Sequence, residues 1–179
     1  MIKLYTFHPE HFNNNGDQGN IEVLAAELTV ALVEFEFVES VAEADFVLIG
    51  DASRAAIRHY TGELEDLRPG MRERFQSGRP TLVVGSSYEF FASEFGMISR
   101  QVPRRSEFFD GDYFGYRNTD TDLPALTRNG EFIATSLYGP FLAKNPRSLS
   151  EILAALGVQV ELSAERLTWI ERIREVSAG

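Results

Sequence analysis

The sequence predicts an α/β fold with three layers: a mostly parallel sheet, helices on both of its faces, and antiparallel edge strands. Two observations predict the parallel sheet. The first is that 46–49 and 81–84 are almost entirely apolar, as is typical of strands covered on both faces. The second is that segments with helical apolar spacing alternate with the strands. A third observation, the Gly-containing turns of the second half, predicts antiparallel hairpins.

The first half of the chain alternates strand and helix. Residues 2–7 form the expected first strand, and a helix follows with Asn20 as its N-cap. A short strand over 34–38 has alternating polarity. Ser53 is expected to cap the helix after strand 46–49. The next helix carries an apolar stripe and ends before Gly78; the stripe consists of Leu64, Leu67, Met71 and Phe75.

The second half contains two hairpin signals and two helices. Asp110-Gly111-Asp112 and Asn129-Gly130 are turn sequences between apolar segments, and we expect both hairpins to extend the sheet edge. A helix is expected to start at Ser148 or Ser150 and to end at Gly157. A final helix over 164–176 has an apolar stripe that includes Ile170. We expect Trp169 to pack against the sheet.

Composition restricts the class of protein. With 179 residues, the chain suits a single domain over 1–179. It contains no cysteine, so disulfides, thiolate metal sites and a cysteine nucleophile are excluded. The net charge of −10 disfavours nucleic acid and anionic membranes as partners, and the basic cluster at 100–105 is interpreted as a solvated loop. No transmembrane run or signal peptide is recognised, so we expect a cytoplasmic protein.

Three loops are expected to meet at the carboxyl ends of the parallel strands, where open α/β sheets bind ligands. They span residues 8–20, 50–54 and 85–88. The last resembles a Gly-x-Ser-x-Gly elbow but lacks its final glycine. Ser86 could be a nucleophile there, yet all three histidines precede it, so capping of the next helix by Ser86 and Ser87 is the simpler interpretation.

Metal and cofactor chemistry have weak support in the sequence. His8 and His11 flank Pro9, which breaks helical presentation, and no third ligand is evident. Four aspartates of the second half lack the spacing of a calcium loop and fit solvated turns better; they are Asp110, Asp112, Asp120 and Asp122. We therefore expect no metal site and no cofactor. A nucleotide binder using amides of 16–20 is a further interpretation, but no Gly-x-Gly-x-x-Gly motif supports it.

Four stretches of the sequence carry a family resemblance. They are Gly16-Asp17-Gln18-Gly19-Asn20-Ile21, the strand 45–50, the elbow 82–91, and Ser136-Leu137-Tyr138-Gly139-Pro140 continuing to Pro146. Together they resemble the class I glutamine amidotransferases of the CobB/CobQ type, whose domain is flavodoxin-like, and they follow the order of that family over positions 16–146. Among these proteins they are most similar to GatD, the glutaminase subunit of lipid II isoglutaminyl synthase, which works with the Mur-ligase-like MurT.

The departures from this pattern concern the catalytic residues. The family's catalytic cysteine falls on Gly85 and its catalytic histidine on Tyr138. A thiolate must attack the amide carbon of glutamine, and an imidazole must move the proton. A glycine has no side chain, and a phenol is a poor base at neutral pH. The resemblance further implies ligand-binding positions at Asp17, Gly50, Asp51, Ser87 and Asn118.

Two functional interpretations follow from the sequence. The first is an amidotransferase-like protein that has lost glutaminase activity and binds or regulates a partner enzyme. Such a partner would be a ligase-like or synthetase subunit resembling MurT, and a small amide or amino acid could be a ligand. The alternative is an active hydrolase or amidotransferase of altered mechanism that uses Ser86, or Tyr138 with Asp17.

Overall fold

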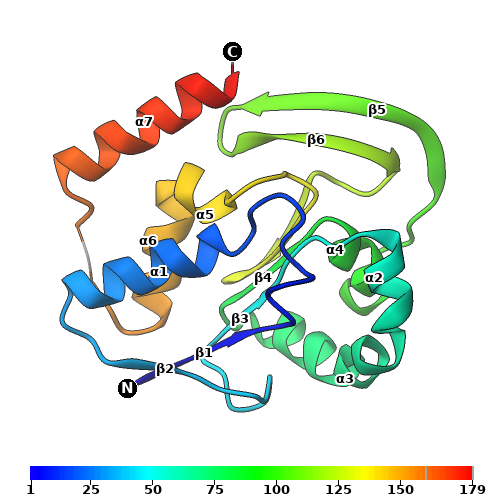
Figure 1. The fold of residues 1–179 in the computed structure, drawn as a ribbon, viewed down its shortest axis with the longest axis horizontal. Helices are drawn as coiled ribbons and strands as arrows, with labels where there is room; N and C mark the ends of the chain where they lie inside the picture. Colours follow the sequence, from blue (N-terminus) through cyan, green and yellow to red (C-terminus); the bar gives the residue numbers. More distant parts are fainter. Residues whose placement is uncertain (160, 179) are drawn as a thin grey trace.

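The computed structural model describes residues 1–159 and 161–178 and contains a six-stranded, mostly parallel sheet (Figure 1). The strand order is β2-β1-β3-β4-β8-β7. Strands β2, β1, β3, β4 and β8 are parallel, and β7 is the antiparallel edge strand. The predicted fold class is therefore confirmed. The strand bounds are β1 Ile2–Thr6, β2 Phe35–Phe37, β3 Phe46–Ile49, β4 Thr81–Val84, β7 Leu126–Asn129 and β8 Phe132–Thr135.

The central strands β3 and β4 are buried on both faces because helices cover both sides of the sheet. Every residue of the two strands is buried. Val47 and Val83 belong to one apolar core, whereas Leu48 and Leu82 belong to the other. This period of two follows from the alternating direction of side chains along a strand. The continuous apolar pattern of the sequence is the consequence.

The helices divide between the two faces, as Figure 1 shows. One core contains side chains of α1, α5 and α6, and the other contains side chains of α3, α4 and the 3₁₀ helix η1. The bounds are α1 Gly19–Val30, α2 Arg54–His59, α3 Thr61–Ser77, α4 Ser86–Phe91, η1 Ala92–Phe95, α5 Phe141–Lys144 and α6 Pro146–Ala155. Ser53 caps α2 by accepting the Ala56 N–H at 3.1 Å, and Gly78 follows α3 at φ 68°, as predicted.

Two predicted helix starts were wrong. Helix α1 begins at Gly19, and Asn20 lies inside it as a buried residue. Its side chain donates to the Asp17 carbonyl and accepts the Leu142 N–H at 2.7 Å, so it joins two loops instead of capping. Helix α6 begins at Pro146 instead of a serine, because proline is well suited to the first helical turn.

The hairpin of β5 (Gln101–Asp110) and β6 (Phe114–Thr121) corrects two further predictions. Its turn is where the sequence predicts it, but the two strands form a separate sheet and do not extend the main one. The basic cluster predicted as a loop lies mostly within β5. Figure 1 shows this hairpin lying across the upper end of the main sheet. Of the two predicted hairpins, β7–β8 belongs to the main sheet and β5–β6 does not.

The last helix, α7 (Ala164–Ala178), packs against α5 and not against the sheet. Ile170 is buried, but Trp169 is 56% exposed, which contradicts the expected packing of its ring on the sheet. Arg166 Nε donates to Glu27 Oε1 at 2.6 Å, and Arg174 Nε donates to the Lys144 carbonyl at 2.8 Å. Helix α7 is therefore attached by these polar contacts as well as by the buried side chain of Ile170. No helix in the described part of the chain is long and apolar enough to cross a membrane.

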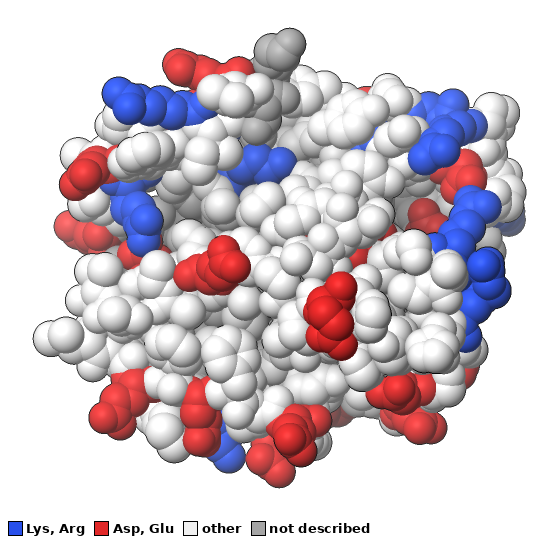
Figure 2. Space-filling model, in the orientation of Figure 1, with Lys and Arg blue, Asp and Glu red and all other residues white. Residues whose placement is uncertain are grey.

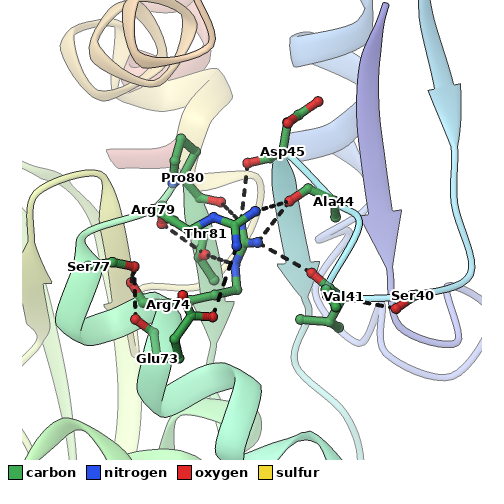
Figure 3. Close-up of polar contacts among 11 residues, drawn as sticks. Ser40, Val41, Ala44, Asp45, Glu73, Arg74, Ser77, Arg79, Pro80 and Thr81 are labelled. Carbon is green, nitrogen blue, oxygen red and sulfur yellow. Dashed lines mark hydrogen bonds and ion pairs between the residues drawn. The ribbon is translucent and has the colours of Figure 1, made fainter.

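A buried arginine ties α3 to the amino ends of β3 and β4. Arg74 is 1% exposed, and Figure 3 shows its guanidinium pointing between the segments that lead into the two strands. Its acceptors are the Thr81 hydroxyl at 2.8 Å and backbone carbonyls before each strand; the carbonyls are those of Val41, Ala44, Asp45 and Pro80. Burial lowers the pKa of Arg74 to about 10, so it remains charged at neutral pH.

Replacing Arg74 by methionine should destabilise the protein by about 3–5 kcal/mol, because five acceptors, three of them in buried hydrogen bonds, would lose the hydrogen bonds that Arg74 donates. Urea unfolding followed by circular dichroism measures this change. The matched control is Arg58→Met on the exposed face of α2, which we expect to alter stability by less than about 0.5 kcal/mol. Equal effects of the two substitutions would contradict the proposed structural role of Arg74.

Candidate functional site

The loops that follow β1, β3 and β4 meet around the carboxylate of Asp51, which confirms their predicted convergence. Asp51 is 6% exposed. Its Oδ2 accepts hydrogen bonds from the side-chain amides of Asn15 at 2.7 Å and Asn14 at 3.2 Å. Its Oδ1 accepts the Ser86 N–H at 2.8 Å and lies 2.8 Å from the Ser86 hydroxyl. One carboxylate thus joins all three loops.

Gly85 has the backbone geometry of a strand-to-helix elbow, with φ 60° and ψ −123°. A Cβ atom at this position would lie 2.4 Å from Asp51 Oδ1 and 2.5 Å from Asp51 Cγ. The Asp51 carboxylate therefore fills the space that a nucleophile side chain would need. Its four hydrogen-bond contacts hold it there, so the space cannot open through a simple change of rotamer.

The two serines after Gly85 make contacts with the β3 loop. Ser86 Oγ accepts the Ala52 N–H at 3.0 Å and can donate to Asp51 Oδ1 or to the Ala52 carbonyl, both at 2.8 Å. Ser87 Oγ donates to the Gly50 carbonyl at 2.7 Å. Neither side chain caps α4, so that prediction was wrong. The hydroxyl of Ser86 has a carboxylate neighbour, whereas the histidines lie elsewhere.

The three histidines gather around one aromatic ring away from the elbow. His8, His11 and His59 have ring centroids 4.1, 5.4 and 4.7 Å from that of Tyr60. His8 Nε2 also contacts Glu63 Oε2 at 2.8 Å. Among residues 1–159 and 161–178, no group of three or more Asp, Glu or His side chains could hold a metal ion.

Asp17 is a fully buried carboxyl group directly behind Asp51. Its Oδ2 accepts the Asp51 N–H at 2.9 Å, whereas its Oδ1 has no hydrogen-bond partner in the described structure. Burial raises the pKa of Asp17 to about 7, and the charge of Asp51 adds to the effect. The charge of Lys144 opposes this shift. Near neutral pH, Asp17 is therefore divided between its acid and its carboxylate form.

Tyr138 completes the site from the loop after β8. Its hydroxyl donates to the Asn118 carbonyl at 2.6 Å, which fixes it beneath β6. Burial raises the pKa of Tyr138, and the negative charges of Asp51 and Glu89 contribute. The phenol therefore stays protonated at neutral pH and acts as a hydrogen-bond donor, not a base. The Tyr138 carbonyl accepts Lys144 Nζ at 2.7 Å.

The structure thus brings Asp17, Gly50, Asp51 and the elbow residues 85–87 together, with Tyr138 and Asn118 on their hairpin side. A Cβ at Gly50 would lie 2.0 Å from the Phe12 carbonyl, so this glycine allows a close backbone approach. Asn118 Oδ1 accepts Arg104 Nε at 2.8 Å, and its side chain is thereby directed at the hairpin. Whether these residues bind a ligand stays a prediction.

Sequence reasoning missed four residues of the site: Asn14, Asn15, Glu89 and Lys144. The run of asparagines before Gly16 was a visible signal for hydrogen-bond donors in the first loop. Glu89 has a pKa raised by burial and by the charges of Asp120 and Asp51. Burial lowers the pKa of Lys144, an effect that the charge of Asp17 opposes. No local pattern identifies Glu89 or Lys144 as site residues.

Comparison with known proteins supports the fold and leaves the family open. No family model matches the sequence, and no curated protein matches it significantly. A solved glutamine amidotransferase from Thermotoga maritima is similar, with a TM-score of 0.51 and 15% identity, over 98% of this chain and 92% of that one. This likeness shows that the chain has a glutamine amidotransferase-like fold.

Two further solved structures have lower scores. A two-domain protein from Anabaena variabilis with DJ-1/ThiJ/PfpI-like and ferritin-like domains has a TM-score of 0.49 and 12% identity, over 96% of this chain and 57% of that one. A candidate GMP synthase component from Thermoplasma acidophilum has a TM-score of 0.48 and 13% identity, over 100% and 98% of the two chains.

The raised pKa of Asp17 predicts that stability falls as pH rises from about 4 to 7. In this window the folded protein holds the Asp17 proton, whereas the unfolded chain, with an ordinary value of 3.8, has released it. The contribution reaches up to about 1.4 kcal/mol per pH unit and levels off above pH 7. Urea unfolding at pH 5 and pH 8 should show a smaller decrease for Asp17→Asn than for the wild type. Asp66→Asn, on the surface of α3, should keep the wild-type slope.

Gly85→Ala should destabilise the protein by about 3 kcal/mol, because a Cβ at a positive φ would also displace the Asp51 carboxylate from its donors. Thermal unfolding provides the measurement. Gly62→Ala is the matched control, since that helical glycine has open space around it and should be neutral or slightly stabilising. A neutral Gly85→Ala variant would show that Asp51 does not block the elbow.

Proposed function

We propose that this chain is a glutamine amidotransferase-like protein that lacks glutaminase activity and acts as a binding or regulatory subunit of a partner enzyme. The observation that carries the proposal is the position of the Asp51 carboxylate. It fills the side-chain space at Gly85 and also binds the N–H of Ser86. Position 85 therefore has no nucleophilic side chain, and the Asp51 carboxylate occupies the space that such a side chain would need.

The occupied Ser86 N–H matters as much as the missing nucleophile. In strand–elbow–helix enzymes, the N–H of the residue after the nucleophile stabilises the oxyanion of the tetrahedral intermediate. Here that N–H points at Asp51 Oδ1 at 2.8 Å. A substrate oxyanion would have to displace an internal carboxylate and would meet its negative charge. Asp51 therefore opposes both the attack on the amide carbon and the stabilisation of the oxyanion that amide hydrolysis requires.

Tyr138 gives further support because it stands where the resemblance places the catalytic histidine. Its hydroxyl is engaged with the Asn118 carbonyl, and burial together with the neighbouring carboxylates raises its pKa. Such a phenol neither removes a proton from a nucleophile nor readily gives one to leaving ammonia. Position 138 therefore supplies no general acid or base for the proton-transfer step of glutamine hydrolysis.

A ligase-like or synthetase subunit is the partner class that the resemblance to GatD and its MurT partner suggests. A small amide or amino acid is the corresponding ligand class. Among the predicted binding positions, Asp17 alone has a side-chain oxygen that is buried without a hydrogen-bond partner in the described residues. A donor group of a ligand or an ordered water would satisfy it.

A hydrolase that uses Ser86 is the second candidate function. The observation that favours it is the 2.8 Å contact between Ser86 Oγ and Asp51 Oδ1, since a carboxylate can in principle accept the hydroxyl proton. The same hydroxyl also contacts the backbone of Ala52. This arrangement equally suits a structural link between two loops. An assay of hydrolysis also tests the alternative in which Tyr138 and Asp17 transfer a proton.

The purified chain should release no ammonia from glutamine above the rate of a no-protein control. Gly85→Cys/Tyr138→His should also stay inactive, because the introduced thiol would overlap the Asp51 carboxylate. A glutamate dehydrogenase-coupled ammonia assay makes the measurement, and a panel of amides and esters covers altered chemistry. Turnover that is lost in Ser86→Ala would support the second candidate and overturn the first. Turnover that Ser86→Ala retains and Tyr138→Phe abolishes would also overturn the first.

The partner itself can be identified by purifying the tagged protein from its host and determining by mass spectrometry what accompanies it. A ligase or synthetase recovered in equal amount supports the proposal. Recovery of the chain free of other proteins, under conditions in which it is abundant, would contradict a subunit role.

A further inference from the structure

The outer edge of β2 and the apolar end of α1 form a surface that the proposed function does not use. Strand β2 lies at one end of the strand order and β7 at the other, so one edge of β2 is unpaired in the sheet. Figure 1 places β2 far from the β5–β6 hairpin. Beside it, three large apolar side chains are exposed: Val30 at 70%, Leu32 at 92% and Phe37 at 57%.

The backbone of β2 is arranged to accept another strand. Ile2 N–H donates to the Glu34 carbonyl, and Val38 N–H donates to the Leu4 carbonyl. In a parallel ladder, even-numbered residues of β2 therefore face β1, and the backbone groups of Phe35 and Phe37 face outward. Unpaired edge groups of this kind are a template for a strand from another chain.

Leu32 is held in an unfavourable backbone conformation at this edge. It follows α1 with φ 57°, where glycine is the usual residue. The N–H groups of Leu32 and Val33 bond back to the carbonyls of Thr29 and Leu28, which is the Schellman arrangement. A leucine there costs about 1–2 kcal/mol relative to an unstrained residue. The side chain of Leu32 is exposed and gains little from packing, so the fold does not explain why a leucine occupies this position instead of a glycine.

An open groove lies between this leucine and the strand. It has a volume of about 620 Å³, and its lining includes Thr29, Leu32, Val33, Glu34 and Phe35. Phe35 and Phe37 share one face of β2, with ring centroids 6.3 Å apart. An added strand would therefore meet an apolar face on the α1 side of the sheet.

The opposite face of the same strand is acidic. Glu34 and Glu36 alternate with the two phenylalanines, and Glu39 follows; none of the three has an ion-pair partner among the described residues. Figure 2 shows acidic side chains along the lower margin of the molecule and few basic ones. Pairing with a second copy would bring these carboxylates together in a chain of net charge −10, which electrostatics opposes.

We propose that the edge of β2 binds an extended segment of a partner protein as an added strand, with basic side chains alternating with apolar ones. The basic residues would face Glu34 and Glu36, and the apolar residues would lie over Phe37 and Leu32. The alternation follows from the period of two in strands, and the basic character follows from the unpaired carboxylates. The binding is independent of chemistry at the elbow.

A fluorescent peptide with four Lys-Val repeats is the probe, and fluorescence anisotropy measures its affinity for the full chain. Two control peptides separate charge from strand pairing. One has glutamate in place of lysine, and the other keeps its lysines but has every backbone amide N-methylated, so that neither of its edges can donate hydrogen bonds to β2. The proposal expects each control to bind at least about tenfold more weakly. Equal binding of the N-methylated peptide would show attraction by charge alone and overturn it.

Two variants test the surface without disturbing the core. Phe37→Pro removes an outward N–H and leaves the bonds to β1 intact, so it should weaken binding of the Lys-Val peptide about tenfold or more. Leu32→Gly should weaken binding while keeping or raising the midpoint of thermal unfolding, because glycine relieves the positive φ. If Leu32 served only the fold, Leu32→Gly would not weaken peptide binding while the midpoint of thermal unfolding stayed the same or rose.

Three outcomes contradict the proposal. They are no binding of the Lys-Val peptide at about 1 mM, unchanged binding in both variants, or a homodimer in analytical ultracentrifugation that Phe37→Pro dissociates. The last would assign the edge to a second copy of the chain. The ammonia assay tests the elbow, whereas the peptide titration tests the edge of β2. Glutaminase activity would therefore overturn the proposed function without contradicting strand binding at β2. Absence of peptide binding would likewise leave the proposed loss of activity unaffected.

Discussion

The carboxylate of Asp51 is the interaction on which the site depends. It draws donors from the loop after β1 and from the elbow after β4, while its own backbone N–H binds Asp17. Gly85 has to be a glycine as long as this carboxylate stays in place, since any Cβ would overlap it. The raised pKa of Asp17 has a related origin, because its burial beside a second carboxylate disfavours another negative charge.

Local sequence signals predicted those parts of the fold that local interactions determine. The cap at Ser53 needs only its immediate neighbours, and burial on both faces makes β3 and β4 visible as continuous apolar runs in the sequence. The start of α1 was missed because Asn20 bonds to Leu142, far away in the sequence. The turn of the β5–β6 hairpin was found, but a turn does not determine which sheet its strands join. That choice depends on tertiary packing, which outweighs local preference.

In the candidate site too, the sequence predicted some features and could not predict those that depend on distant partners. The family resemblance predicted roles for the positions of Gly85 and Tyr138, and these roles stay predictions; the topology of a parallel sheet predicted that three loops converge. The sequence could not predict that Asp51 points into the elbow, because a side-chain direction depends on partners from other loops. Lys144 and Glu89 were missed for the same reason. Their significance comes from burial beside carboxylates, which only the packed structure reveals.

The distribution of backbone strain at this elbow differs from that expected where an elbow holds a nucleophilic side chain. An enzyme that places a nucleophile at positive φ holds a strained residue at its catalytic centre. Here that position is a glycine, for which φ 60° carries little strain, while His8 and Leu32 are the positive-φ residues with side chains among those described. Cores on both faces of the sheet and the Arg74 network stabilise the fold without using the elbow. Because much of the stability comes from these cores and from the Arg74 network, the proposed loss of activity at the elbow is compatible with a retained fold. The strain at Leu32 then lies at an exposed sheet edge, where contact with another chain can compensate for it.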